Sequence, residues 1–137
     1  MTHRKLIFLG AVHAAFAVAM GAIASHVMRN RLTPHDFTVF EIGARYHMYG
    51  GLGTVVMALA LERGIASKLP AYLLQAGILL FAGSLYLLPI TGLRAFGALT
   101  PFGGTFFMLA WLWLAKDAWL GVRSTPPPAP TSPATPL

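Results

Sequence analysis

Histidine is the side chain of this sequence best suited to chemistry, because imidazole binds metals and haem and carries protons near neutral pH. His13 and His26 both fall within the first apolar run. A helix would place them about 140° apart around its axis and about 20 Å apart along it, so one metal ion cannot bind both. His13 is therefore predicted to be hydrogen-bonded inside a helical bundle. Haem binding by His13 is the alternative, and it lacks a second histidine well inside another apolar run.

A group of polar residues is predicted at one face of a membrane. His26 lies where the first apolar run ends, and the next helix begins on the same side with Glu41, Arg45 and His47. Arg94, in the link between the third and fourth runs, returns to that side. Ionisable groups at membrane depth are costly and often functional, so a substrate or proton site is one interpretation. The other, which we favour, is a structural network in which Glu41 and Arg45 form a helix-surface pair worth about 0.2–0.5 kcal/mol.

The sequence contains no recognisable catalytic or metal-binding arrangement. It has no cysteine, which excludes disulfides, thiolate catalysis and cysteine-ligated metals. Its acidic residues all lie at predicted helix ends or turns: Asp36, Glu41, Glu62 and Asp117. It lacks a serine–histidine–aspartate arrangement, a metal-ligand spacing and a glycine-rich phosphate loop. We therefore expect no enzyme activity, no metal and no cofactor.

The composition is that of an integral membrane protein. Of 137 residues, 56% are hydrophobic and 10% are charged, against about 25% charged in an average soluble domain. The formal net charge is +6, but the lysines and arginines lie near the ends of apolar runs, where they anchor helices at the membrane interface. No basic run alternates with aromatic residues, so nucleic acid is not expected as a partner. The partner that the composition does predict is the lipid bilayer.

The apolar runs predict an all-α fold, an integral membrane four-helix bundle with short links. No charged residue occurs from Leu6 to Val27, a stretch of about 33 Å as a helix, which suffices to cross the hydrocarbon core. The predicted four-span domain covers residues 1–121, with spans at about 6–28, 35–62 with an amphipathic start, 70–90 and 101–120. The proline-rich segment 122–137 is predicted to be a disordered tail.

Two helix starts share one signal, a threonine cap followed by proline. Thr33-Pro34 is expected to begin the second helix, and Thr100-Pro101 the fourth. Four spans place both chain ends on one side of the membrane. Six lysines and arginines lie on that side and four on the other, which favours cytoplasmic termini: Arg4, Lys5, Arg63, Lys68, Lys116 and Arg123 against Arg29, Arg31, Arg45 and Arg94.

Small residues predict where the helices pack. Ala17, Gly21 and Ser25 recur every four residues in the first span, and Gly50 and Gly51 share a face of the second. Small side chains allow helix backbones in lipid to approach closely. We expect the first span to pack on the second through these residues. A seam to a second copy or to a membrane-protein partner is the alternative.

Four sequence blocks carry a resemblance to a known family: "GAIASH" at 21–26, "FEIGARYHMYGGL" at 40–52, "LFAGSLYLLPITG" at 80–92 and "RAFGALTPFGG" at 94–104. With these blocks the chain resembles the YgdD-like family of small four-helix membrane proteins, a bacterial family of unknown function. The resemblance implies an inner-membrane location and a first span that is retained, although "AIA" before Ser25 also fits a signal-peptidase site. The chain departs from the family in having Gly50 where a histidine is usual, and in having Pro89.

The expected function is non-enzymatic: a small membrane scaffold or accessory protein that packs against a membrane-protein partner or a second copy. The small-residue faces and the lack of acidic residues inside the spans favour it. The alternative is a small oligomeric transporter or channel for an anion or proton, lined by His26, Arg45 and His47. A haem or metal redox subunit is the weakest of the three interpretations.

Overall fold

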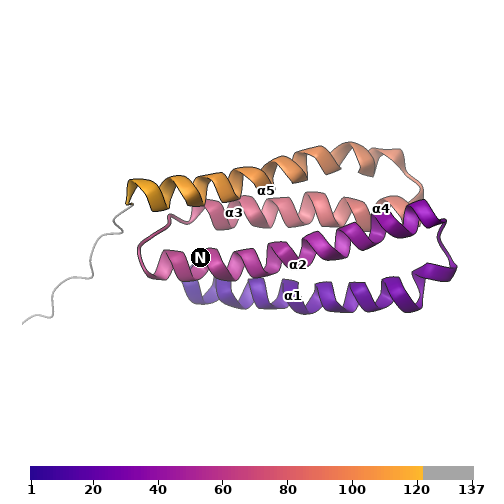
Figure 1. Cartoon of the computed structure of the whole chain (residues 1–137), viewed down its shortest axis with the longest axis horizontal. Helices are drawn as coiled ribbons and strands as arrows, with labels where there is room; N and C mark the ends of the chain where they lie inside the picture. The colour runs from indigo at the N-terminus through magenta and orange to yellow at the C-terminus, as the bar shows by residue number, and fades with distance from the viewer. Residues whose placement is uncertain (122–137) are drawn as a thin grey trace, which may run out of the picture.

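The chain folds into long helices that run side by side along the molecule (Figure 1). This computed structural model describes residues 1–121. The third helical rod, residues 69–91, is continuous but has three parts, of which the middle one is π-helical. The elements are α1 (His3–His26), the 3₁₀ turn η1 (Met28–Asn30), α2 (Pro34–Glu62), α3 (Leu69–Gly77), the π-helical η2 (Ile78–Ala82), α4 (Gly83–Thr91) and α5 (Arg94–Leu120). The predicted all-α, four-helix fold is confirmed, and residues 1–121 contain no strand. The predicted tail, 122–137, lies outside the described residues.

α2 begins where its sequence signal indicates. The Thr33 hydroxyl accepts a hydrogen bond from the backbone N–H of Asp36 at 3.2 Å, and Pro34 occupies the first turn. The cap satisfies one of the N–H groups that a helix start leaves without a partner. Asp36 in the first turn also lies at the positive end of the helix dipole.

α5 begins earlier than predicted, so the expected start at Thr100-Pro101 is wrong. Gly92, with φ 69°, ends α4, Leu93 is extended, and α5 starts at once at Arg94. Pro101 therefore lies inside α5. The Thr100 hydroxyl does not cap a helix but forms a hydrogen bond with the Ser84 hydroxyl of α4 at 2.8 Å. A threonine and a proline suit a helix start, but here the left-handed glycine turn sets the boundary.

Three helical stretches within residues 1–121 are long and apolar enough to cross a membrane: His3–Asn30, Leu69–Thr91 and Arg94–Leu120. α2 is long enough, at 29 residues or about 43 Å, but its composition is more polar. Asp36, Glu41, Arg45 and His47 all belong to it. Length and apolar composition thus identify three of the four predicted spans. α2 is placed beside them because it packs along α1.

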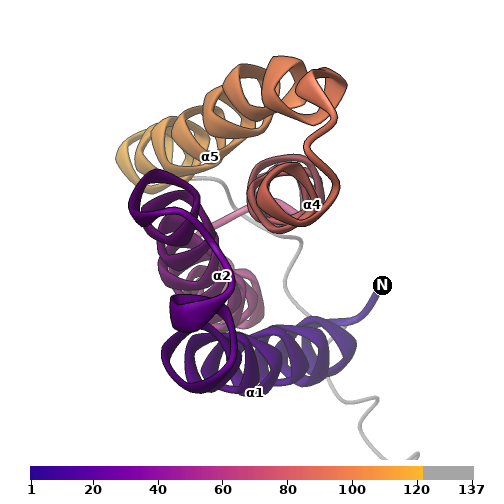
Figure 2. The same ribbon diagram turned by 90° about the vertical axis from the view of Figure 1, so that its right-hand side faces the viewer.

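The helices form a curved layer in which each rod contacts the next. α1 packs along α2, α2 packs against α3, η2 and α4, and this rod packs against α5. Figure 2 shows α1 and α5 at opposite sides of the molecule, with α2 and α4 between them. Two apolar clusters fill the interior, one including Met57, Leu74 and Phe107 and the other including Phe40 and Tyr86. The contact of α2 with the third rod therefore joins the first helix pair to the second.

α1 and α2 lie in close backbone contact at two glycines. A Cβ atom on Gly51 would lie 2.7 Å from the backbone N of Ala14 and 2.9 Å from the carbonyl O of Gly10, both on α1. A Cβ atom on Gly10 would in turn lie 2.7 Å from the carbonyl O of Gly51. The contact is therefore backbone to backbone, which small residues allow, and neither glycine has room for a side chain.

The five residues predicted to pack the first helix on the second have different environments. Gly51 lies in the close contact with α1, and Ala17 is buried. Gly50 faces side chains of η2 and α5, so it packs α2 on the other helix pair. A Cβ atom on Gly21 would have no neighbour within 4 Å, and the exposed Ser25 hydroxyl donates to the Gly21 carbonyl of its own helix. This close contact of Gly10 and Ala14 with Gly51 thus lies nearer the start of α1 than the predicted ladder.

Asp117 holds the end of α5 to the loop between α2 and α3. Its carboxylate accepts hydrogen bonds from the backbone N–H of Ser67 at 2.8 Å and from the Ser67 hydroxyl at 2.6 Å. Only 2% of the Asp117 side chain is exposed, and Lys116 Nζ lies 3.7 Å from its other oxygen. A buried carboxylate is stable only when it is paired in this way.

Replacing Asp117 with alanine is expected to lower the free energy of unfolding by about 1–3 kcal/mol, because the Ser67 N–H loses its acceptor. Thermal unfolding of the detergent-purified protein measures the effect. Ser67→Ala is the matched control: it removes the hydroxyl bond and keeps the backbone bond, so it should lose less. Equal stability of Asp117→Ala and the unmodified protein would contradict this account of the loop.

Candidate functional site

A chain of side-chain hydrogen bonds runs through the middle of the bundle. Tyr86 Oη lies 3.2 Å from His47 Nδ1, and His47 Nε2 lies 2.8 Å from His13 Nδ1. His13 Nε2 lies 2.8 Å from Gln75 Oε1, and Gln75 Nε2 donates to Thr54 Oγ1 at 2.6 Å. The Thr54 hydroxyl then donates to a backbone carbonyl of its own helix at 2.8 Å. We call these five residues the central chain.

One assignment of protons satisfies every link of the central chain. Since the Thr54 hydroxyl donates to a carbonyl, it accepts from the Gln75 amide, whose oxygen then accepts from His13 Nε2–H. His13 Nδ1 is then free to accept from His47 Nε2–H, and His47 Nδ1 accepts from the Tyr86 hydroxyl. A neutral imidazole has one donor and one acceptor nitrogen, so both histidines fit this pattern uncharged. Every donor in the chain therefore points the same way.

The central chain draws on four helical elements. His13 comes from α1, His47 and Thr54 from α2, Gln75 from α3 and Tyr86 from α4. His13 is half-buried, while His47 and Tyr86 are 6% and 7% exposed and Thr54 is fully buried. Because the chain crosses from the first helix pair to the second, it ties the two halves of the bundle together at the depth of the hydrocarbon core.

His13 and His47 form a pair that the sequence did not predict. The expectation that no histidine lies at the depth of His13 is wrong, because α2 begins at Pro34 and His47 falls near the middle of its 29 residues. The ring nitrogens of the pair are used by each other and by their neighbours in the chain. Within residues 1–121, no three histidine or acidic side chains converge as metal ligands would.

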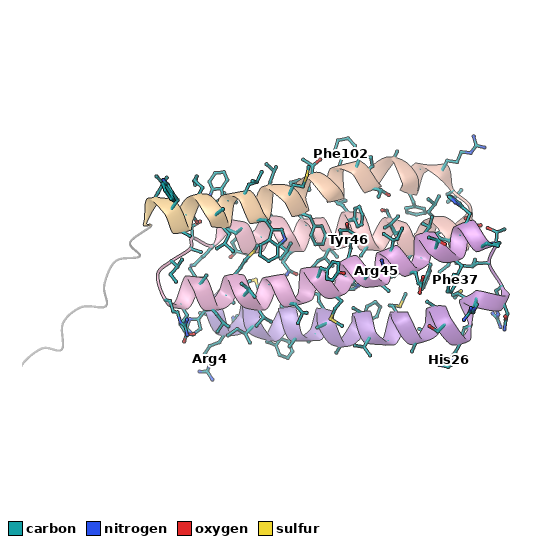
Figure 3. All side chains as sticks on the ribbon, in the orientation of Figure 1. Arg4, His26, Phe37, Arg45, Tyr46 and Phe102 are labelled. Carbon is teal, nitrogen blue, oxygen red and sulfur yellow. The ribbon has the colours of Figure 1, made fainter. Side chains whose placement is uncertain are left out.

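The polar group predicted at one membrane face is distributed in the structure. Figure 3 shows His26 at the end of α1 and Arg45 nearer the middle of α2. Both are exposed, as is Arg94 at the start of α5, and Glu41 is partly exposed. Among residues 1–121, Glu41 and Arg45 form no ion pair with each other or with another residue. Only His47 belongs to the central chain, so the structure does not bring the five residues together.

Three members of the central chain carry weak sequence signals. Gln75 is the single glutamine of the sequence and lies in the charge-free run between Lys68 and Arg94, where an amide needs a partner. Tyr86 lies in the same run. Thr54 has no distinguishing signal, since threonine in a helix often bonds its own backbone. A polar residue inside an apolar run is therefore the signal that identifies Gln75.

Two hollows lie at opposite ends of the bundle. One, of about 850 Å³, is lined by Met1, Thr2, His3, Arg4, Lys5, Leu61, Glu62 and Lys68. The other, of about 350 Å³, is lined by Arg29, Leu32, Pro34, Phe37 and Thr38. None of these residues belongs to the central chain, so neither hollow opens onto it.

Comparison with protein families decides the assignment. Residues 20–104 match the model of a family described as a protein of unknown function, DUF423. The chain belongs to the DUF423 family. The matched range contains all four blocks that carried the resemblance, and it includes His47, Thr54, Gln75 and Tyr86 of the central chain. The resemblance to a small membrane family of unknown function is confirmed at this level.

Individual DUF423 relatives match over most of their length. The chain is 40% identical over 118 residues to the UPF0382 membrane protein YwdK of Bacillus subtilis, covering 84% of this chain and 96% of the relative. It is also 40% identical over 114 residues to the UPF0382 membrane protein SSP2132 of Staphylococcus saprophyticus, covering 81% and 93%. No solved structure matches. The relatives support a bacterial membrane protein and do not assign an activity.

Proposed function

We propose that this protein is a non-enzymatic accessory or scaffold protein of the bacterial inner membrane, which packs against a second copy or another membrane protein. The proposal rests on the internal hydrogen bonding of the central chain. Each of its polar atoms has a partner within the chain or the backbone. Among residues 1–121, every buried side-chain nitrogen or oxygen has a hydrogen-bond partner. A substrate at this depth would find no buried side-chain nitrogen or oxygen that is not already hydrogen-bonded within the protein.

The outer surface supports the same proposal. Many large apolar side chains are exposed along the helices, as contact with lipid or a membrane partner requires. Trp111, Trp113 and Trp119 lie in the last turns of α5, where aromatic residues anchor a helix at the interface. Lys116 lies over the ring of Trp113, 3.7 Å from its centre. With six basic residues on the side of the chain ends against four, we propose cytoplasmic termini.

A second candidate function is proton transfer, and one observation favours it. The central chain holds two histidines at membrane depth, linked by donors that all point the same way. Histidine chains of this kind act as proton relays in pumps and transporters. Two features count against this candidate: neither hollow described above opens onto the chain, and no member of the chain is acidic.

Reconstitution in proteoliposomes separates the two functions. With a pH-sensitive dye inside and an imposed pH gradient, we expect proton flux equal to that of protein-free vesicles. Flux above that level, lost in His13→Phe while the helical circular dichroism is retained, would replace the scaffold proposal with proton transfer. The scaffold proposal also expects the protein to migrate as a complex after mild extraction from native membranes, and a lone monomer there would contradict it.

A further inference from the structure

The outward side of α2 carries a charged residue among apolar ones. Arg45, Tyr49, Leu52, Val56 and Leu59 are all exposed, and we call this set the α2 outer face. Their spacing alternates between four and three residues, which places them in one stripe along the helix. Tyr49 and Leu52 are each more than half exposed. The stripe has the period of the contact line between two long helices that cross at a small angle.

Arg45 lies at a depth where an unpaired charge is expensive. It is eleven residues after Pro34, about 17 Å along a helix of about 43 Å, and two residues before the central-chain His47. Among residues 1–121, no carboxylate forms an ion pair with it. Charged side chains at membrane depth are rare, and they usually pair with each other or face a protein interior. The chain by itself supplies Arg45 with neither.

The nearest candidate carboxylate on this side of α2 is also without an ion pair. Glu41 lies one turn before Arg45, about 6 Å along the axis, and is partly exposed. Opposite charges four residues apart are neighbours on a helix surface, and their pairing is worth about 0.2–0.5 kcal/mol. Here each of the two charges remains available to a neighbouring molecule that offers the opposite charge about one helical turn away along the axis.

We propose that the α2 outer face binds the same face of a second copy, with Arg45 of each copy paired to Glu41 of the other. A two-fold axis along the membrane normal sets two α2 helices parallel at equal depth, so both charge pairs form at once. The α2 outer face then supplies Arg45 and the apolar contact, and Glu41, one turn before Arg45, supplies the opposite charge. This inference rests on the proposed scaffold function and names its partner.

Cross-linking of single cysteines tests the contact directly, because the chain has no cysteine of its own. Leu52→Cys on the α2 outer face is expected to give a disulfide-linked dimer on mild oxidation in native membranes. Leu112→Cys on α5, which is 66% exposed against 53% for Leu52, is the matched control and is expected to remain monomeric. Equal dimer yields at the two positions would mean random collision and would overturn the proposal.

Charge exchange then tests the proposed pairs. In the Leu52→Cys background, Arg45→Glu and Glu41→Arg are each expected to remove most of the dimer, while the double exchange restores it. Arg45→Gln, which removes the positive charge without adding a negative one, is expected to weaken the dimer less than Arg45→Glu does. A monodisperse profile in size-exclusion chromatography shows that each variant is folded. Unchanged dimer in the folded single variants would overturn the pairing. Cross-linking of Leu52→Cys chiefly to a different membrane protein would overturn self-association but not the scaffold function. Proton flux in the proteoliposome experiment would overturn the scaffold function but not self-association.

Discussion

Replacing Gly51 with alanine is expected to destabilise the protein, whereas the same change at Gly21 is expected to stabilise it slightly. At Gly51 the new methyl group would meet backbone atoms of Ala14 and Gly10 at 2.7 and 2.9 Å, and these move only with α1 as a whole. Such overpacking costs about 1–3 kcal/mol. Gly21 has no neighbour within 4 Å of a Cβ atom, and alanine is favoured over glycine in a helix by about 0.8–1.0 kcal/mol.

The apparent melting temperature in detergent, followed by circular dichroism, measures both glycine variants. Both changes replace glycine with alanine inside a long helix. A fall in melting temperature at Gly51 with a rise at Gly21 therefore reflects the different space around the two positions. Gly51→Ala at or above the stability of the unmodified protein would mean that α1 and α2 do not touch at this point. A loss at Gly21 as large as that at Gly51 would place the contact along the Ala17–Gly21–Ser25 ladder instead.

Replacing His47 with leucine is expected to lower the free energy of unfolding by about 1–3 kcal/mol, because it leaves the Tyr86 hydroxyl and a His13 nitrogen without partners together. One interhelical hydrogen bond in a membrane is worth only about 0.6 kcal/mol on average, so the unpaired atoms dominate the loss. His26→Leu is the matched control. His26 is exposed at the end of α1, and its loss is expected to leave the stability nearly unchanged.

A double-mutant cycle with His13→Leu isolates the histidine pair. Removing both imidazoles leaves fewer unpaired atoms between them than the two single changes do, so the double variant is expected to lose less than the sum of the singles. Strict additivity would show that the 2.8 Å contact contributes nothing to stability. A loss for His26→Leu equal to that for His47→Leu would shift the important polar site to the membrane face.

The sequence predicted the helical architecture well where a local signal decided it. Low charge and long apolar runs require helices, and Thr33 followed by Pro34 places the start of α2 where it is observed. Thr100 followed by Pro101 carries the same local signal and failed, because Gly92 ends the preceding helix and lets α5 begin at Arg94. A local cap signal therefore predicts a helix start only when no stronger turn precedes it.

The central chain was harder to predict, because it depends on how helices are rotated against one another. His13 and His47 were each noted, but their pairing requires the depth and rotation of α2 relative to α1. The close contact at Gly51 fixes that relation, and it cannot be read from either helix alone. Arg45 was predicted to join the same cluster as His47, yet two residues along a helix turn it to the outside.

The hydrogen-bond partners of the histidine pair are divided between the two halves of the chain. α1 and α2 are made first, and their hairpin can already join His13 to His47. That hairpin still has a donor on His13 and an acceptor on His47 without partners, and an unmatched polar group in hydrocarbon is costly. Gln75 and Tyr86 supply the partners only when the third rod has been inserted. The first helix pair alone therefore leaves the histidine pair without two of its hydrogen-bond partners, and the second half of the chain supplies both.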